Sequence, residues 1–326
     1  MKQSPLSHLL AVLLFTCILG LIYANGVARN RVIEHEVETR KALVVNSFLS
    51  LFIQAKAGYV YDIPHKKVLF KKNEQTALPL ASLSKIITLI TAKESGFLPS
   101  QVTISEKSLT EEGDVGLLAG EIWGADDLLR ILMIASSNDS ATAIRTIVEE
   151  TIQKKYEAQG QSYGGTPSFI NLMNDTAKTH GWMSLVFVNE SGLDLDEANK
   201  IPSNVGSAHD IGAALEYTST KYPEILTVTQ TPEITLTSSD GFTGTFKNTD
   251  PLTEKDLKIL YSKTGYTDSA GGNLAVIEKA NTGDEILIVV LGSTLEGRFT
   301  DTESMIGATN AYLEGIRNAG LTLENF

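Results

Sequence analysis

Hydrophobic and polar positions follow three different patterns along this chain of 326 residues. An uncharged apolar run covers residues 9–24, helical spacing dominates residues 107–225, and short strand-like runs lie on both sides of that region. Apolar residues recurring every three or four positions predict helices, and short runs bounded by turn residues predict strands. Strands at both ends with helices between them predict an α+β fold in which the terminal strands share one sheet.

The individual elements can be placed from the same pattern. The expected strands are residues 58–62, 67–72, 233–237, 257–263, 273–279 and 285–292. The expected helices are residues 126–134, 138–153, 168–181, 208–220 and 302–318, with a loop at 160–165. A further helix is expected to begin at Ser82, because Pro79 ends the preceding segment and an apolar helical face follows. The central helices form a lobe, and its boundary with the sheet is where a cleft is expected.

The first 28 residues have the pattern of an export element. Lys2 gives a positive start, the apolar run follows, and Gly26-Val27-Ala28 has the small-x-small form of a cleavage site. The run is long for a signal peptide and short for a membrane span, so both a cleaved signal peptide and a retained anchor stay open. Residues 1–28 are therefore assigned to this element, residues 29–52 to an amphipathic connector and residues 53–326 to the main domain. The main domain is expected to be extracytoplasmic, in the cell envelope.

Composition excludes several classes of function. The net charge is −12, and no cluster of cations is present, which argues against a nucleic-acid partner. The only cysteine, Cys17, lies in the apolar run, so the rest of the chain can form no disulfide and no thiolate metal site. His65, His180 and His209 lack metal-ligand spacing, and neither a metal nor a cofactor is expected. Adjacent residues do not readily face one another, which disfavours a triad through His209 and Asp210 and favours Asp210 as a helix cap.

Ser82 and Lys85 form the only Ser-x-x-Lys in the chain. At the start of a helix, residues three apart lie on one face, so the lysine can reach the serine hydroxyl. A serine becomes a useful nucleophile when a base takes its proton, and burial next to another cation shifts a lysine toward the neutral amine. Taken alone, however, the pair is better explained by a capping serine and a surface lysine.

Two further motifs follow in order. Ser136-Ser137-Asn138 lies between two expected helices, where a hydroxyl can relay a proton and an amide can both donate and accept hydrogen bonds. Lys263-Thr264-Gly265 ends a strand, where glycine allows a ligand to approach and the other two residues supply a cation and a donor. Helix capping or a turn explains either motif alone. The three together form the set found in penicillin-binding proteins and β-lactamases.

The sequence resembles the serine D-alanyl-D-alanine carboxypeptidases, the low-molecular-mass penicillin-binding proteins, from about Ala57 to Gly320. The stretches that carry the resemblance are residues 78–86, 120–121, 127–129, 136–139, 189–193, 263–267 and 270–271. The sequence departs from that family at two positions. Glu190 stands where the family usually has proline, and Ser137 stands where it more often has glycine.

The resemblance implies a three-layer fold, with a five-stranded antiparallel sheet between helices and an all-helical lobe beside it. It also implies that the penultimate D-Ala of a peptidoglycan stem peptide acylates Ser82 and that water then cleaves the acyl-enzyme. Lys85 would be the base and Ser136 a proton relay. The residues implied in substrate binding are Asn138, Lys263, Thr264, Gly265, Tyr266 and Arg298.

Further details follow from the same resemblance. The oxyanion would lie between the backbone N–H groups of Ser82 and Tyr266. Arg298 would help bind the substrate carboxylate, whereas its plainer interpretation is a surface charge paired with Asp301 or Glu303. The expected partners are the stem peptide and β-lactam antibiotics as covalent inhibitors, with an N-terminal membrane tether as a candidate and no nucleic acid.

Two other functions compete with the carboxypeptidase. A β-lactamase needs a second base to deacylate the enzyme, and Glu190 is the one candidate in the region after the second motif. Its surroundings look like the carboxypeptidase loop instead. A non-hydrolysing penicillin or peptidoglycan sensor would keep Ser82 but release no product, yet every chemistry-bearing position is present.

Overall fold

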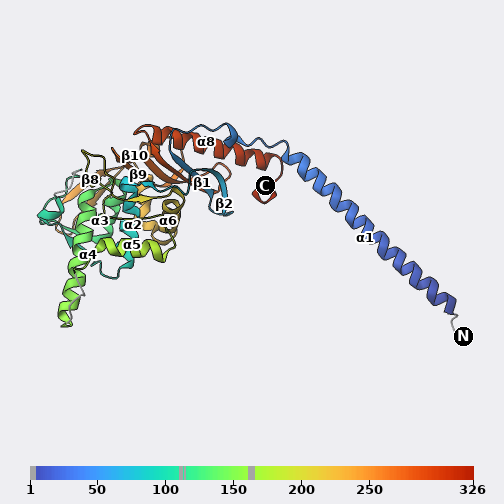
Figure 1. The fold of residues 1–326 in the computed structure, drawn as a ribbon, viewed down its shortest axis with the longest axis horizontal. Helices are drawn as coiled ribbons and strands as arrows, with labels where there is room; N and C mark the ends of the chain where they lie inside the picture. Colours follow the sequence, from blue (N-terminus) through green and yellow to red (C-terminus); the bar gives the residue numbers. More distant parts are fainter. Residues whose placement is uncertain (1–4, 110–112, 114, 161–165) are drawn as a thin grey trace. The chain divides into compact units, whose positions relative to one another are not determined.

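Five strands from the two ends of residues 48–310 form one antiparallel sheet in the computed structural model, which describes residues 5–109, 113, 115–160 and 166–326. The strands are β1 (Ala57–Asp62), β2 (Lys67–Lys72), β9 (Ile259–Thr267), β10 (Gly271–Lys279) and β11 (Glu285–Ser293). Their order in the sheet is β2-β1-β11-β10-β9 (Figure 1). The first and last strands therefore share a sheet, and the predicted α+β fold is confirmed.

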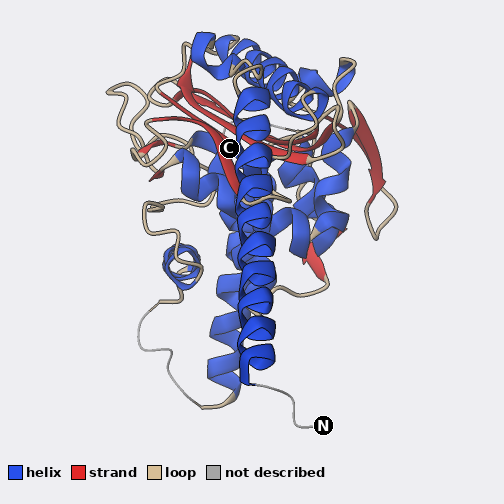
Figure 2. Ribbon diagram, turned by 90° about the vertical axis from the view of Figure 1, so that its right-hand side faces the viewer, coloured by secondary structure: helices blue, strands red, loops and turns tan. Residues whose placement is uncertain are grey.

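Helices cover both faces of this sheet (Figure 2). On one face lies α6 (Ala208–Lys221), packed so closely that a Cβ added at Gly212 would come within 3.0 Å of Leu287. On the other face lies the first part of α8 (Gly297–Asn318), whose Met305 comes within 3.4 Å of a Cβ added at Gly58. Because both faces are covered, β10 and β11 are almost continuously buried, with unbroken apolar runs at residues 274–277 and 286–291.

The helical lobe is built around α2 (Lys85–Glu94), whose first eight residues are all buried. A helix surrounded on every side has no exposed polar face, which explains why apolar residues lie all around this segment, with Thr88 and Thr91 buried among them. The other helices are α3 (Ala125–Ile134), α4 (Asn138–Ala158), α5 (Phe169–Thr179) and α7 (Pro223–Leu226). The short strand pairs are β3 (Leu78–Pro79) with β6 (Val205–Gly206), β4 (Gln101–Thr103) with β5 (Ile122–Gly124), and β7 (Glu233–Thr237) with β8 (Thr243–Lys247).

Three sequence expectations need correction or stay untested. The strand at residues 233–237 lies outside the main sheet, because a turn pairs it with β8. The strand β8 itself was not among the expected strands. The helix expected from Ser82 begins at Lys85 instead. The preceding 3₁₀ turn Ala81–Ser84 opens on a residue with φ +48°, in the left-handed region, which an α-helix does not contain. Apart from Gly160, the loop expected at 160–165 lies outside the described residues.

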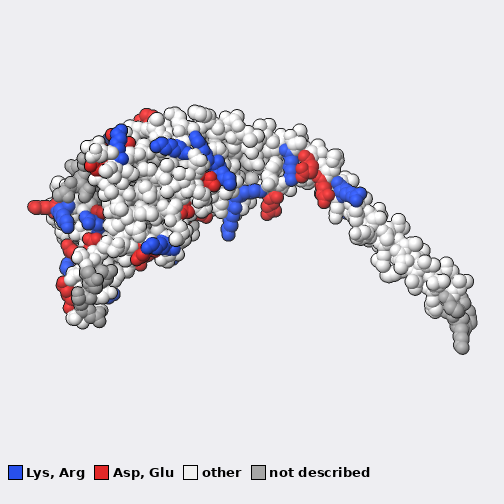
Figure 3. All heavy atoms as spheres, in the orientation of Figure 1, with Lys and Arg blue, Asp and Glu red and all other residues white. Residues whose placement is uncertain are grey.

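A second unit comprises Met1–Ser47 and Ala311–Phe326. Its helix α1 (Pro5–Lys41) continues well past residue 28, so residues 29–41 of the expected connector are helical. Among the described residues, only this helix is long and apolar enough to span a membrane, and a signal sequence has the same character. Figure 3 shows no charged side chain along its first described part and a group of them toward its end. Near that end Arg40 and Glu36 form an ion pair at 2.6 Å.

Candidate active site

Ser82 and Lys85 lie within hydrogen-bonding distance inside the protein. Lys85 Nζ is 2.9 Å from Ser82 Oγ, and the lysine is fully buried at the start of α2. The interpretation of Lys85 as a surface residue is therefore wrong. Ser82 does not cap α2 either, because Ser84 occupies the N-cap position and its side chain makes no capping bond.

The hydrogen-bond partners of Lys85 prepare it to act as a base. Besides Ser82, its Nζ donates to Asn138 Oδ1 and to the Ser191 carbonyl, both at 2.6 Å. A neutral amine has two hydrogens and one lone pair. When those two acceptors take both hydrogens, the lone pair is left to accept the proton of the Ser82 hydroxyl. The arrangement is therefore suited to activating a serine nucleophile.

Ser136 contacts Lys263, the first residue of the Lys263-Thr264-Gly265 motif. Lys263 Nζ donates to Ser136 Oγ at 2.8 Å and to the Thr264 carbonyl at 2.9 Å. Ser136 has φ +57°, an unusual conformation for a residue with a side chain, and such strain is concentrated at functional sites. The cap of α4 is Ser137, whose hydroxyl accepts from Ser140 N at 3.0 Å, so neither Ser136 nor Asn138 is needed for capping.

The end of β9 lies against the turn that carries Ser82. A Cβ added at Gly265 would be 3.2 Å from Ser82 N and 2.9 Å from the Leu80 carbonyl, so a larger residue would push the strand away. The neighbouring Thr264 hydroxyl is 2.6 Å from that of Thr249, a residue that sequence reasoning did not find. Tyr266 is 44% exposed and lies at the rim of the site.

Arg298 is buried and holds the end of β9 from behind. Its Nη1 donates to the Gly265 carbonyl at 2.8 Å. The plainer interpretation as a paired surface charge is wrong, because Asp301 accepts from the backbone N–H groups of Gln54 and Ala55, and Glu303 pairs with Lys255. Arg298 therefore fixes the strand that the resemblance implies in substrate binding.

The site concentrates positive charge in a dry environment. Burial holds the pKa of Lys263 well below the ordinary lysine value, and the charges of Lys85 and Arg298 lower it further while Asp250 opposes them. Burial also lowers the pKa of Arg298 and raises that of Asp250. Cations held close together without full compensation attract an anionic group, such as a carboxylate terminus.

The charge of Lys263 is expected to reduce the stability of the folded protein. Its folded-state pKa lies below the unfolded value, so the penalty is complete below the folded pKa and disappears as pH rises to the unfolded pKa, about 10.4. Lys263→Met should therefore raise the free energy of unfolding at pH 7 by about 1 kcal/mol. Urea denaturation between pH 7 and 10 measures this gain, which should shrink as pH rises. A constant loss of stability at every pH would contradict the expectation.

A loop that the sequence only partly indicated completes the site. In the 189–193 loop (Asn189–Leu193), the Ser191 carbonyl accepts from Lys85, and Gly192 has φ +86°. A Cβ added at Gly192 would lie 2.0 Å from the Ala81 carbonyl, so only glycine fits against the turn before Ser82. The resemblance drew attention to this segment, but no residue pattern reveals the role of a backbone carbonyl.

Glu190 does not have the surroundings of a second base. Its side chain is 6% exposed, and its Oε1 accepts from Arg145 Nε at 2.7 Å and from Thr142 Oγ1 at 3.0 Å. Both donors belong to α4, so the carboxylate is engaged in a partly buried ion pair. The β-lactamase alternative is not favoured, because its only candidate for a deacylating residue is occupied.

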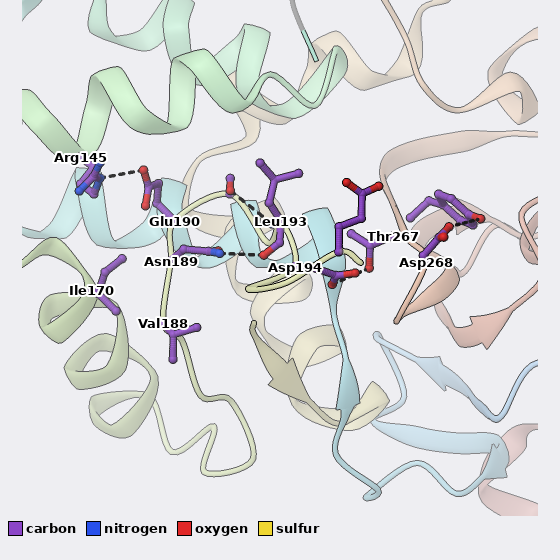
Figure 4. A pocket seen from close by; sticks show the side chains of 12 residues that line it. Arg145, Ile170, Val188, Asn189, Glu190, Leu193, Asp194, Thr267 and Asp268 are labelled. Atoms are coloured by element: carbon purple, nitrogen blue, oxygen red, sulfur yellow. Dashed lines mark hydrogen bonds and ion pairs between the residues drawn. The ribbon is translucent and has the colours of Figure 1, made fainter. Parts of the chain in front are cut away.

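A cavity of about 640 Å³ opens beside the loop (Figure 4). Ser82 and Lys85 do not line it, but Ser191 and Tyr266 do, which connects the cavity to the site. Its lining residues are Arg145, Ile170, Val188, Asn189, Glu190, Ser191, Leu193, Asp194, Glu197, Tyr266, Thr267 and Asp268. The cleft expected between lobe and sheet is therefore present, since the lining comes from lobe helices, the loop and β9.

Two statements about histidines need revision. His209 Nδ1 lies 2.8 Å from Asp210 Oδ1, although the residues are adjacent, and the cap of α6 is Ser207 rather than Asp210. His65 has neighbours with metal-ligand atoms, because Asp62, His65 and Asp284 each place one such atom within 4.8 Å of the others. Sequence spacing could not show this, since two different turns bring the three together.

Comparison with known proteins agrees with this fold and site. Penicillin-binding protein D2 of Listeria monocytogenes, solved with cefotaxime bound, matches 79% of this chain and 98% of its own with a TM-score of 0.63 and 25% identity. A D-alanyl-D-alanine carboxypeptidase structure from Mycobacterium tuberculosis matches 80% and 92% of the two chains with a TM-score of 0.65, and at 24% identity it supports the fold alone. The fold and site thus define a penicillin-binding, transpeptidase-like protein.

Sequence relatives narrow this class. A D-alanyl-D-alanine endopeptidase of Pseudomonas aeruginosa is 27% identical over 72% of this chain and 70% of its own length. The D-alanyl-D-alanine carboxypeptidase DacF of Bacillus subtilis is 26% identical over 78% of this chain and 61% of its own. The family model described as D-alanyl-D-alanine carboxypeptidase matches residues 45–294. The chain belongs to this family of serine peptidases, and the sequence-based assignment is confirmed.

Proposed function

We propose that this protein releases the terminal D-Ala from peptidoglycan stem peptides through an acyl-enzyme on Ser82. Ser82 Oγ attacks the carbonyl carbon of the penultimate D-Ala while Lys85 Nζ takes the hydroxyl proton. The C–N bond then breaks, and the leaving nitrogen takes a proton from the Ser136 hydroxyl. Ser136 is reprotonated by the proton that Lys85 took from Ser82. Water attacks the ester, which frees the shortened peptide and restores Ser82.

The observation that carries this proposal is the set of three oxygens around Lys85 Nζ. Two of them, Asn138 Oδ1 and the Ser191 carbonyl oxygen, are atoms that can only accept, and the third is the proposed nucleophile at 2.9 Å. With the two carbonyl oxygens taking the hydrogens of a neutral Lys85 amine, its lone pair is available to the Ser82 hydroxyl. The proposed oxyanion site, between the N–H groups of Ser82 and Tyr266, is consistent with the close approach of Gly265 to Ser82 N.

The rest of the site suits a peptide that ends in a carboxylate. Lys263, Thr264 and Arg298 line or support the end of β9, where they supply positive charge and donors for the terminal carboxylate. Asn138 is proposed to contact the substrate amide as well as Lys85. β-Lactam antibiotics are proposed to acylate Ser82, since a related structure holds cefotaxime.

A second candidate activity is cleavage of peptide cross-links. Relatives in Pseudomonas aeruginosa and Escherichia coli, at 27% and 28% identity, are named D-alanyl-D-alanine endopeptidases. The acylation step is the same in both reactions, and only the leaving amine differs. The apolar start of α1 is compatible with export, and we propose that residues 1–28 direct the main domain to the cell envelope as a signal peptide or anchor.

The protein is expected to react with penicillin and to release the product slowly, because Arg145 engages Glu190, the candidate for a second base. The measurement combines D-Ala release from diacetyl-Lys-D-Ala-D-Ala, cleavage of a D-Ala-linked dimer, and turnover of a chromogenic cephalosporin. D-Ala release with slow cephalosporin turnover supports the carboxypeptidase. Cleavage of the dimer alone supports the endopeptidase, rapid cephalosporin turnover a β-lactamase, and a penicillin adduct without any release a sensor.

A further inference from the structure

The two groups that orient Lys85 belong to different parts of the chain. Asn138 is the first residue of α4, and Ser191 lies in the 189–193 loop. Their separation determines where the two hydrogens of a neutral amine point, and hence whether its lone pair faces Ser82 Oγ. A shift of either acceptor would misdirect the base, and misplacements of about 1 Å can lower a catalytic rate about 100-fold.

An ion pair joins these two parts directly behind the site. Asn138, Thr142 and Arg145 are spaced by four and three residues, so they follow one face of α4. From this face Arg145 donates to the Glu190 carboxylate at 2.7 Å (Figure 4). Thr142 donates to the same carboxylate at 3.0 Å. Glu190 immediately precedes Ser191 in the chain.

The backbone of Glu190 is held from the helix that carries Lys85. Thr88 Oγ1 on α2 donates to the Glu190 carbonyl at 2.6 Å. Within the loop, Asn189 Oδ1 accepts from Gly192 N at 2.8 Å, which fixes the turn around Ser191. Glu190 is thus bound to α2 through its backbone and to α4 through its side chain. These are the two helices that carry Lys85 and Asn138.

We propose that the Arg145–Glu190 ion pair positions the general base of this enzyme. It holds the Ser191 carbonyl at a set distance from Asn138 Oδ1, and so directs the Lys85 lone pair toward Ser82. Both are positioning residues, because they act on the reaction through the partners of Lys85. This role rests on the proposed functions of Ser82 and Lys85. The proposed role also explains why this chain has Glu190 at a position where proline is usual in the family that the sequence resembles.

Acylation by a fluorescent penicillin tests the role in the full chain, with the rate constant of the acylation step separated from the initial dissociation constant. Arg145→Gln is expected to lower that rate constant about 10- to 100-fold and to leave the dissociation constant within about twofold. Arg145→Lys, which keeps the charge, should recover part of the rate. A role limited to stability would alter the fraction of folded protein and not the rate constant of the folded molecules.

Arg130→Gln is a matched control. Arg130 forms a similar half-buried ion pair with Asp127 at 2.6 Å on α3, in a different part of the lobe. Its variant should acylate at the wild-type rate. If Arg145→Gln does not fold, as judged by its thermal transition, the acylation rate constant of Arg145→Lys is compared with that of the wild type. A smaller decrease of this rate constant is then expected.

The outcomes separate the inference from the proposed function. A folded Arg145 variant with the wild-type rate constant, or with a loss confined to the dissociation constant, overturns the positioning role. A wild-type protein that forms no adduct and releases no D-Ala overturns the proposed function instead. A slowed acylation step with partial recovery in Arg145→Lys supports the inference.

Discussion

Ser82→Ala should form no covalent penicillin adduct and should release D-Ala at least about 10⁴-fold more slowly than the wild type. The Ser82 hydroxyl lies 2.9 Å from Lys85 Nζ, the proposed base. Alanine removes the attacking oxygen and leaves the buried lysine in place. Intact-protein mass spectrometry after incubation with penicillin measures the adduct directly, and peptide mapping locates it.

Ser95→Ala provides the control for this experiment. Ser95 follows α2 and its hydroxyl bonds only within its own turn, to the Ala92 carbonyl and from Phe97 N. This variant should retain the adduct and the activity, at a cost of about 1 kcal/mol or less in stability. An adduct that survives Ser82→Ala would show that another residue is the nucleophile.

Lys85→Met should slow acylation by about 10²- to 10⁴-fold while Ser82 stays in place. Methionine has a similar length and polarity low enough for burial, but it cannot accept the serine proton. It also leaves Asn138 Oδ1 and the Ser191 carbonyl without this donor, which costs about 1–3 kcal/mol for each acceptor that stays buried. The rate of adduct formation, followed over hours by mass spectrometry, measures the loss.

Lys93→Met distinguishes the base from an ordinary lysine of the same helix. Lys93 lies near the end of α2 and pairs with Asp126 at 2.8 Å near the surface. Its replacement should change the acylation rate by less than about twofold. Equal rates in Lys85→Met and the wild type would exclude Lys85 as the base and would point to Lys263 and Ser136 as the proton route.

Much of this site could be predicted from the sequence. Ser82, Lys85, Ser136, Asn138 and the Lys263-Thr264-Gly265 strand end lie together, although 53 residues separate the contacting pair Lys85 and Asn138 and 127 residues separate Ser136 and Lys263. The order of short motifs and the apolar runs were sufficient, because each motif stands at the end of an element whose position in the fold follows from topology.

Other parts of the site had no local signature. The Ser191 carbonyl is a backbone atom, so its role depends on the path of the loop and not on a side chain. Thr249 and Asp250 are ordinary loop residues in the sequence, and they enter the site only because that loop passes beside β9. In the sequence, Glu190 departs from the proline usual in the family and is a candidate for a second base. Its partner Arg145 can be identified only from the structure, where α4 and the 189–193 loop lie side by side.

The sequence by itself determined the class of fold and pointed to the proposed nucleophile, its proposed base and the two supporting motifs, because these depend on local patterns and on residue types that few other sites combine. Only the tertiary structure decided that Lys85 is fully buried, that Ser137 rather than Ser136 caps α4, and that Arg298 supports β9. Burial and long-range contacts depend on how the elements pack, and packing is a property of the whole fold. Ser82 and Lys85 could thus be identified from the sequence, whereas the acceptors that orient the lysine, Asn138 Oδ1 and the Ser191 carbonyl, became visible only in the fold.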